Sequence, residues 1–279
     1  DDDALLDAAA AGELDTVAGI ESQVRRMLDD PKARRGVTNF LRQWLHIDEF
    51  EDTLRDPDLF PAYEQDPEAM RASMVEQMNR FFERIVLEEE GSVADLLTSR
   101  TVEVDQRLAP IYGVSHPGGD EWITVELPEE ERKGALTMAA WLTRYGFSRL
   151  PATFRRAKFI KERILCDTLP PPDDDADLSP VVLEDGVSNR ESLEARLEQS
   201  ANCQACHQSF GHFGYAFESF DSIGQFRTVE ANGAVIDTSG VIHQSDDVDG
   251  EFDGWSDLLD RMATSEDVSD CMNEQVFRF

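Results

Sequence analysis

Apolar side chains recur every three or four positions through the first hundred residues, with polar side chains between them. This period places the apolar residues on one face of an α-helix and predicts a series of amphipathic helices. The clearest stripes are Val17, Ile20, Val24, Met27 and Leu28; Val37, Phe40, Leu41, Trp44 and Leu45; and Met70, Met74, Met78, Phe81, Ile85 and Val86. Residues that favour a helix start precede them: Asp15, Asp30 with Pro31, and Asp66 with Pro67, while Ser92 can open a short helix through Leu97. The methionines fit this stripe as core residues.

The pattern changes after residue 109. Residues 110–128 contain Pro and Gly and predict a loop between two parts of the chain. Helices are predicted near 130–143 and 151–166, followed near 169–188 by a stiff acidic linker. A helix from about Asn189, a small β-hairpin around Asn232 and Gly233, and helices from near Asp253 and Ser265 complete the chain. The sequence therefore predicts a mainly α fold, with a helical domain over 1–128 and a second helical unit with a small β-hairpin over 129–279.

The charge of the chain narrows the choice of partners. Its 58 acidic and 26 basic residues give a formal net charge of −32. Such a surface repels nucleic acids and anionic lipids, and it suits a high-salt milieu, as in halophilic proteins, where salt screens the self-repulsion. There is no run of 18 apolar residues, so we expect no membrane insertion.

Residues 200–210, SANCQACHQSF, contain the segment with the most specific chemistry. Cys203 and Cys206 are three positions apart, and His207 follows directly. On a helix the two thiols face the same way, so each can bond to one vinyl group of a porphyrin. The adjacent histidine can then bind the iron as proximal ligand. The spacing predicts one covalent haem c.

Zinc or redox disulfide chemistry would require other features. A zinc site needs two further ligands, but Cys166 and Cys271 are far apart in sequence, and His212 is the one close candidate. A thioredoxin-like site favours a βαβ setting, whereas the surroundings here are helical and loop-like. The segment 245–254, SDDVDGEFDG, partly resembles a calcium loop but lacks the closing Glu, so an acidic turn is the favoured interpretation.

Several segments in one order resemble a known family. They are GALTMAAWLT, RRAKFIKERILCDTLPPP, CQACHQSFGHFGYAFESFDSIGQFR, IDTSG and SDCMNEQVFRF, preceded by LLDAAAAGELDT and FLRQWLHID. Together they are similar to the planctomycete-type cytochrome c family, large secreted bacterial proteins with consecutive domains of unknown function around one CxxCH motif. The resemblance implies a cytochrome c-like unit from residue 129, one covalent haem, an exported location and a longer parent polypeptide.

These features favour electron transfer through the haem outside the cytoplasm, with a redox partner protein or a small oxidant as partner. Two alternatives remain open. The first is a haem enzyme that acts on peroxide or another small oxidant, so whether the chain is an enzyme stays undecided. The second is a surface structural or binding module in which haem acts as a staple.

The two remaining cysteines predict a disulfide. Once Cys203 and Cys206 bind haem, Cys166 and Cys271 are left, and exported proteins seldom keep free thiols in an oxidising compartment. The bond would join the start of the linker to the C-terminal helix. Two buried free thiols are the alternative.

The sixth iron ligand is predicted to be Met138. This residue lies in GALTMAAWLT, and its small neighbours Ala139 and Ala140 would let a flat macrocycle approach. Methionine would raise the reduction potential relative to two histidines. His243 and an open sixth position are the next alternatives, followed by Met262, Met272 and His212.

Overall fold

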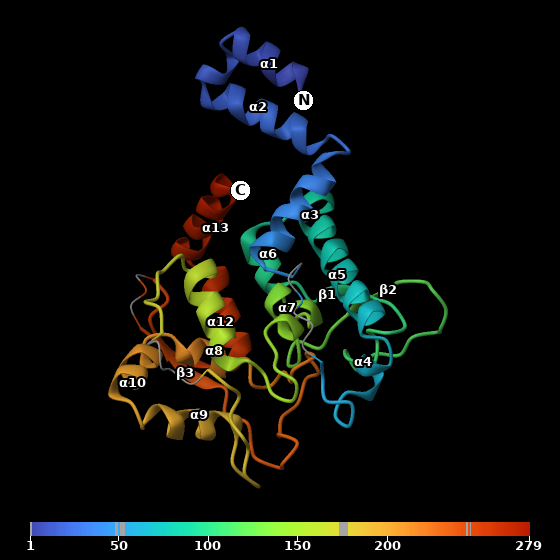
Figure 1. Ribbon diagram of the computed structural model, residues 1–279. Helices are drawn as coiled ribbons and strands as arrows, with labels where there is room; N and C mark the ends of the chain where they lie inside the picture. Colours follow the sequence, from blue (N-terminus) through green and yellow to red (C-terminus); the bar gives the residue numbers. More distant parts are fainter. Residues whose placement is uncertain (1, 48–49, 51–53, 173–177, 244, 246) are drawn as a thin grey trace.

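The computed structural model describes residues 2–47, 50, 54–172, 178–243, 245 and 247–279. Within them the fold is mainly α, as the hydrophobic pattern predicts (Figure 1). The first half contains α1 (Asp3–Ala10), η1 (Glu13–Asp15), α2 (Val17–Leu28), α3 (Ala33–Trp44), α4 (Pro61–Gln65), α5 (Pro67–Glu83), η2 (Arg84–Glu88) and α6 (Val93–Thr98). The second half contains η3 (Ala135–Thr137), α7 (Ala139–Arg144), α8 (Thr153–Phe159), η4 (Ile160–Ile164), α9 (Asn189–Leu197), α10 (Ala201–Gln208), α11 (Gly211–Tyr215), α12 (Gly254–Ala263) and α13 (Glu266–Arg278).

The predicted helix starts agree with the structure where a side chain caps the helix. Asp66 accepts a hydrogen bond from the first turn of α5, and Ser92 forms a reciprocal capping box at the start of α6. The prediction was one residue early for α2, where the cap is Thr16 instead of Asp15. It was also early for α3, which begins at Ala33 without a side-chain cap.

Two short antiparallel sheets complete the fold. Strand β1 (Thr101–Val104) pairs with β2 (Ile123–Glu126), so the predicted loop 110–128 contains one strand of an unpredicted sheet. Strand β3 (Ser239–Ile242) pairs with β4 (Gly250–Asp253), and this is the hairpin of the second half.

The chain turns back at Asn232 and Gly233 as predicted, but the predicted hairpin is limited to a single antiparallel bridge, Val229 with Val235, and no strands form in this described segment. The Asn232 side chain contributes to this turn and also ties it to another segment. Its Oδ1 accepts the Ala234 N–H, and its Nδ2 donates to the carbonyls of Glu184 and Val187.

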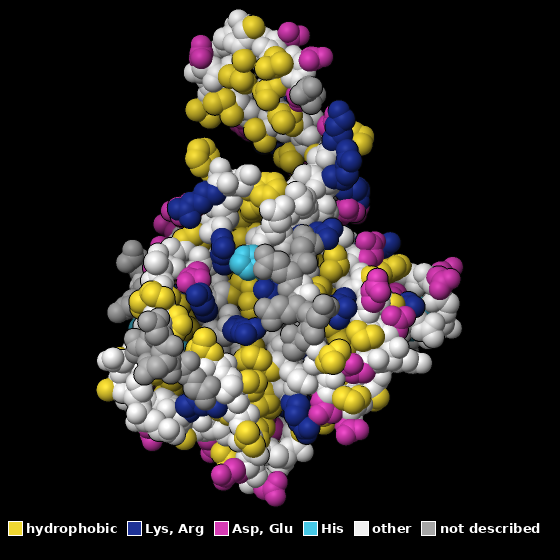
Figure 2. All heavy atoms as spheres, in the orientation of Figure 1, with side chains coloured by type: hydrophobic (Ala, Val, Ile, Leu, Met, Phe, Trp, Pro, Cys, Tyr) yellow, Lys and Arg dark blue, Asp and Glu magenta, His cyan; other side chains and the backbone are white. Residues whose placement is uncertain are grey.

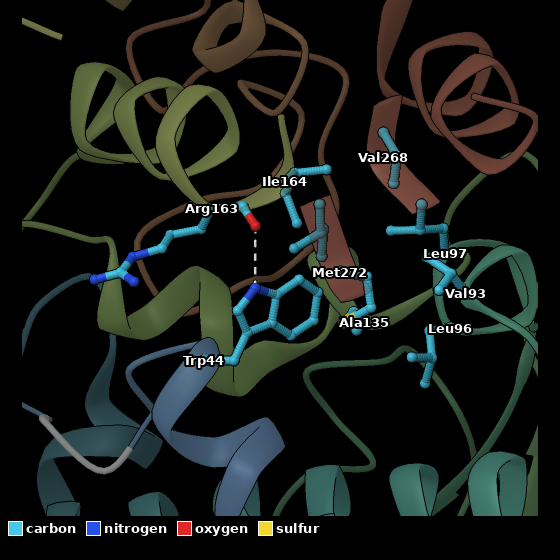
Figure 3. Close-up of a pocket in the computed structure, with 10 residues that line it drawn as sticks. Trp44, Val93, Leu96, Leu97, Ala135, Arg163, Ile164, Val268 and Met272 are labelled. Atoms are coloured by element: carbon cyan, nitrogen blue, oxygen red, sulfur yellow. Dashed lines mark hydrogen bonds between the residues drawn. The ribbon is translucent and has the colours of Figure 1, made fainter. Parts of the chain in front are cut away.

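One apolar cluster connects the two halves of the chain. It includes the methionine stripe of α5, Trp44 of α3 and Leu258 of α12. Trp44 Nε1 donates to the carbonyl of Arg163 at 3.0 Å, beside a cavity of about 10 Å³ lined by α3, α6, η4 and α13 (Figure 3). This volume is at the lower limit for one water molecule, and the lining is mainly apolar. The domain boundary at residue 128 stays a prediction. Residues 173–177 of the predicted linker lie outside the described residues, and 169–172 and 178–187 form no helix or strand.

Helices α1 and α2 project beyond the main body (Figure 1). The α2 stripe predicted from the sequence is exposed to solvent, with Val17 81% and Ile20 49% accessible. Figure 2 shows apolar side chains gathered on this pair of helices. In the described part of the chain, no helix is both long and apolar enough to cross a membrane.

Candidate functional site

The CxxCH segment forms the eight-residue helix α10. Ser200 caps it by accepting a hydrogen bond from the backbone N–H of Cys203 at 3.3 Å. Cys203 and Cys206 are three positions apart on this helix; neither belongs to a disulfide, and both are half-buried. One helical turn therefore presents both thiols on the same side.

His207 lies directly after Cys206 and is half-buried. Burial lowers the pKa of His207 to about 4, so its imidazole is neutral at pH 7. Its Nδ1 atom is buried and has no hydrogen-bond partner among the described residues. A neutral imidazole beside two cysteines that form no disulfide fits the donor set of a covalent haem c.

Aromatic rings surround this histidine. The Phe154 ring centroid is 3.9 Å from that of His207, and the Phe210 centroid is 4.8 Å away. Phe154 comes from α8, whereas Phe210 lies between α10 and α11. The site is therefore built by helices that are about 50 residues apart in the sequence.

The two other histidines near this end of the chain differ in their bonding. His212 Nδ1 accepts a hydrogen bond from the backbone N–H of Val241 at 2.9 Å. The neutral ring then carries its proton on Nε2, which makes that nitrogen a donor and weakens the case for His212 as an iron ligand. Burial is the main cause that lowers the pKa of His212, and the nearby His243 contributes. His243 itself follows β3 and is exposed.

The methionine candidates are all core residues. Met138 is 1% exposed and precedes α7, where its carbonyl accepts the Leu142 N–H. Met262 lies on α12, and Met272 lines the small cavity of Figure 3. Nothing in the contacts of Met138 tests its assignment as sixth ligand, which stays a prediction.

The acidic segment 245–254 caps a helix. Asp247 accepts hydrogen bonds from the Ser265 hydroxyl at 2.8 Å and from the Glu266 and Asp267 backbone N–H groups at the start of α13. Asp246 lies outside the described residues. No group of three or more His, Cys, Asp or Glu suited to a metal ion occurs in the described residues. The capping contacts of Asp247 agree with the favoured interpretation of an acidic turn.

A disulfide joins Cys166 and Cys271, with the Cα atoms 5.4 Å apart. It connects the segment after η4 to α13. This is the disulfide predicted from the two cysteines outside the CxxCH motif.

Sequence reasoning missed a buried polar network beside α9. Glu218 is 1% exposed and accepts hydrogen bonds from the Thr153 hydroxyl and from Asn189 Nδ2. Glu230, also buried, accepts the backbone N–H of Asn189 at 2.6 Å. These bonds hold the first residue of α9, the helix that leads into α10. A single Asn among polar residues gives no periodic signal that could have revealed this role.

Replacing Glu218 with Gln is expected to change how stability depends on pH. Burial raises the pKa of Glu218, so the folded protein holds its proton more strongly than the unfolded chain does. The stability gained from this proton is fully present below the pKa that Glu218 has in the unfolded chain. It is lost as the pH rises from there through the higher pKa of Glu218 in the folded protein. Gln cannot ionise but keeps an acceptor oxygen, so the variant should lose less stability between acid and neutral pH. Urea unfolding of both proteins across this range measures the difference; identical pH profiles would contradict the buried-carboxyl account.

Two family models match parts of this chain. Residues 1–114 match the family model PSD4, and residues 132–230 match the family model PSCyt3; they are described as proteins of unknown function (DUF1592 and DUF1588, respectively). No curated protein and no solved structure matches the chain. The second match contains α10 with its CxxCH segment. Over these two stretches the chain is thus similar to domain families that are associated with planctomycete cytochromes c.

Proposed function

We propose that this chain is a c-type cytochrome that binds one haem covalently and transfers electrons outside the cytoplasm. The observation that carries the proposal is the donor set of α10. Two cysteines outside any disulfide, on one helical turn, adjoin a neutral, half-buried imidazole whose buried Nδ1 has no hydrogen-bond partner among the described residues. Each thiol adds across one vinyl group, with sulfur bonding to one carbon and hydrogen to the other, so attachment needs no oxidant.

In this proposal the residues of the chain have separate tasks. Cys203 and Cys206 hold the macrocycle, and His207 donates a nitrogen lone pair to the iron. Met138 is the proposed sixth ligand. When bound, the haem supplies one-electron redox chemistry; the protein contributes burial, orientation and exclusion of water. The Cys166–Cys271 disulfide is compatible with an exported protein in an oxidising compartment.

The proposal is tested on protein matured in a host that exports it and attaches haem. We expect a reduced-minus-oxidised spectrum typical of a c-type haem, reversible reduction by small mediators, and little binding of carbon monoxide. Strong binding of carbon monoxide or cyanide would instead favour the haem enzyme, because it reveals an open sixth position.

Matched variants separate attachment from folding. Cys203→Ser with Cys206→Ser should lose the covalent haem yet keep the helical circular dichroism, because both side chains are half-buried at the surface of α10. Ser269→Ala on α13 is a control that leaves the donor set intact, and it should mature normally. Covalent haem in the double variant would contradict the assignment of these two cysteines.

A further inference from the structure

Helices α8 and α11 lie against each other because two glycines of α11 have no side chain. A Cβ atom on Gly214 would collide with the carbonyl oxygen of Thr153, at the start of α8. A Cβ atom on Gly211 would lie 3.3 Å from Cε1 of Phe154, which is tighter than most packed contacts. The sequence GHFG, residues 211–214, thus lets α11 approach closely enough for Phe154 to reach His207.

Phe154 is held firmly in this position. Its backbone belongs to α8, where the neighbouring Thr153 bonds to buried Glu218. Helix α11 also contributes, because the ring contacts Tyr215 with centroids 6.1 Å apart. Tyr215 is itself buried and is covered by the Arg190 guanidinium at 4.6 Å. The phenyl ring therefore has packing partners besides the histidine.

The contact with His207 is close and directional. The two ring centroids are 3.9 Å apart at an interplanar angle of 53°. Phe210 is 4.8 Å from the imidazole but 6.4 Å from Phe154, so the two phenyl rings cover different sides of it. The two phenyl rings therefore hinder rotation of the imidazole about its Cβ–Cγ bond.

We propose that Phe154 is a positioning residue for the haem ligand His207: it fixes the orientation of the imidazole and keeps water from one side of it. This inference rests on the proposed function. A fixed axial imidazole and a dry surrounding are two means by which proteins tune a haem. Less water near the iron disfavours the more positively charged ferric form, so the Phe154 ring raises the reduction potential.

The test uses the full chain carrying covalent haem and two readouts, the reduction potential and the electron paramagnetic resonance spectrum of the ferric protein. Phe154→Leu keeps an apolar side chain of similar bulk but removes the ring. We expect covalent haem to be retained, the potential to become more negative, and the g-values of the ferric signal to move. Gly211→Ala, which presses on Phe154 from α11, should shift the same two readouts.

Phe226→Leu is the matched control. Phe226 is also a half-buried phenylalanine, and its ring contacts Phe220 at 5.8 Å, away from His207. This variant should lose similar packing yet keep the wild-type potential and ferric spectrum. Wild-type values for both readouts in Phe154→Leu, or equal shifts in Phe226→Leu, would overturn the inference while leaving the proposed function intact. A wild-type protein that matures without covalent haem would overturn the proposed function, and the inference with it.

Discussion

Replacing Arg156 with Met is expected to prevent stable folding. The Arg156 side chain is fully buried, and its guanidinium donates to five backbone carbonyls at 2.9–3.1 Å. These carbonyls belong to Leu142, Tyr145, Phe217, Phe220 and Asp221. Burial lowers the pKa of Arg156 to about 9, which leaves the guanidinium charged at neutral pH.

The size of the effect follows from the carbonyls that lose their donor. The carbonyls of Tyr145, Phe217 and Asp221 also accept a backbone N–H and keep that partner. A hydrogen bond from a charged group contributes about 1.5–3 kcal/mol, so the removal of five such bonds leaves a loss of about 5 kcal/mol or more even after partial rearrangement. That equals much of the stability of a typical domain, about 5–15 kcal/mol. We expect insoluble protein or an unfolded circular dichroism spectrum.

Arg155→Met is the control, because it removes the neighbouring arginine, which is exposed on α8. It should fold, with a loss of about 1 kcal/mol or less. A folded Arg156→Met protein with near wild-type urea midpoint would show that the carbonyl network is not a main source of stability.

Removing the Cys166–Cys271 disulfide is expected to have the next largest effect. The bond spans a sequence separation of 105 residues. For a loop of this length the chain-entropy model gives a stabilisation of about 4–5 kcal/mol, an upper value because strain and residual structure reduce it. Cys166→Ser with Cys271→Ser should therefore lower the free energy of unfolding by several kcal/mol. Urea unfolding measures the loss.

Thiol labelling gives an independent check of the same bond. In unfolded, unreduced protein with haem attached, neither Cys166 nor Cys271 should react. Two labels per chain would show that the bridge does not form.

The sequence predicted the class of fold because helix periodicity and caps are local. Asp66 and Ser92 open their helices as expected, since a cap needs only residues within one turn. Strands β1 and β2 were missed because their partners are separated by a loop and each strand has only four residues. The α2 stripe has the right period, but no pattern within the helix tells whether a neighbour covers it.

The candidate site also has a part that the sequence predicts and a part that it does not. The spacing of Cys203, Cys206 and His207 can be read directly, because the chemistry lies within five residues. The role of Phe154 could not be found, since it depends on two glycines in another helix. Arg156 was also beyond prediction, because its partners are backbone carbonyls that any residue supplies.

The central claim is that one haem is bound covalently to α10, and the mass of the denatured protein tests it most directly. Protein matured in an exporting host is extracted with acid and acetone, unfolded, and weighed by mass spectrometry. The account predicts that the colour stays with the polypeptide and that its mass exceeds the chain by one haem group. An uncoloured polypeptide with the mass of the chain alone, from a host that matures other c-type cytochromes, would contradict it.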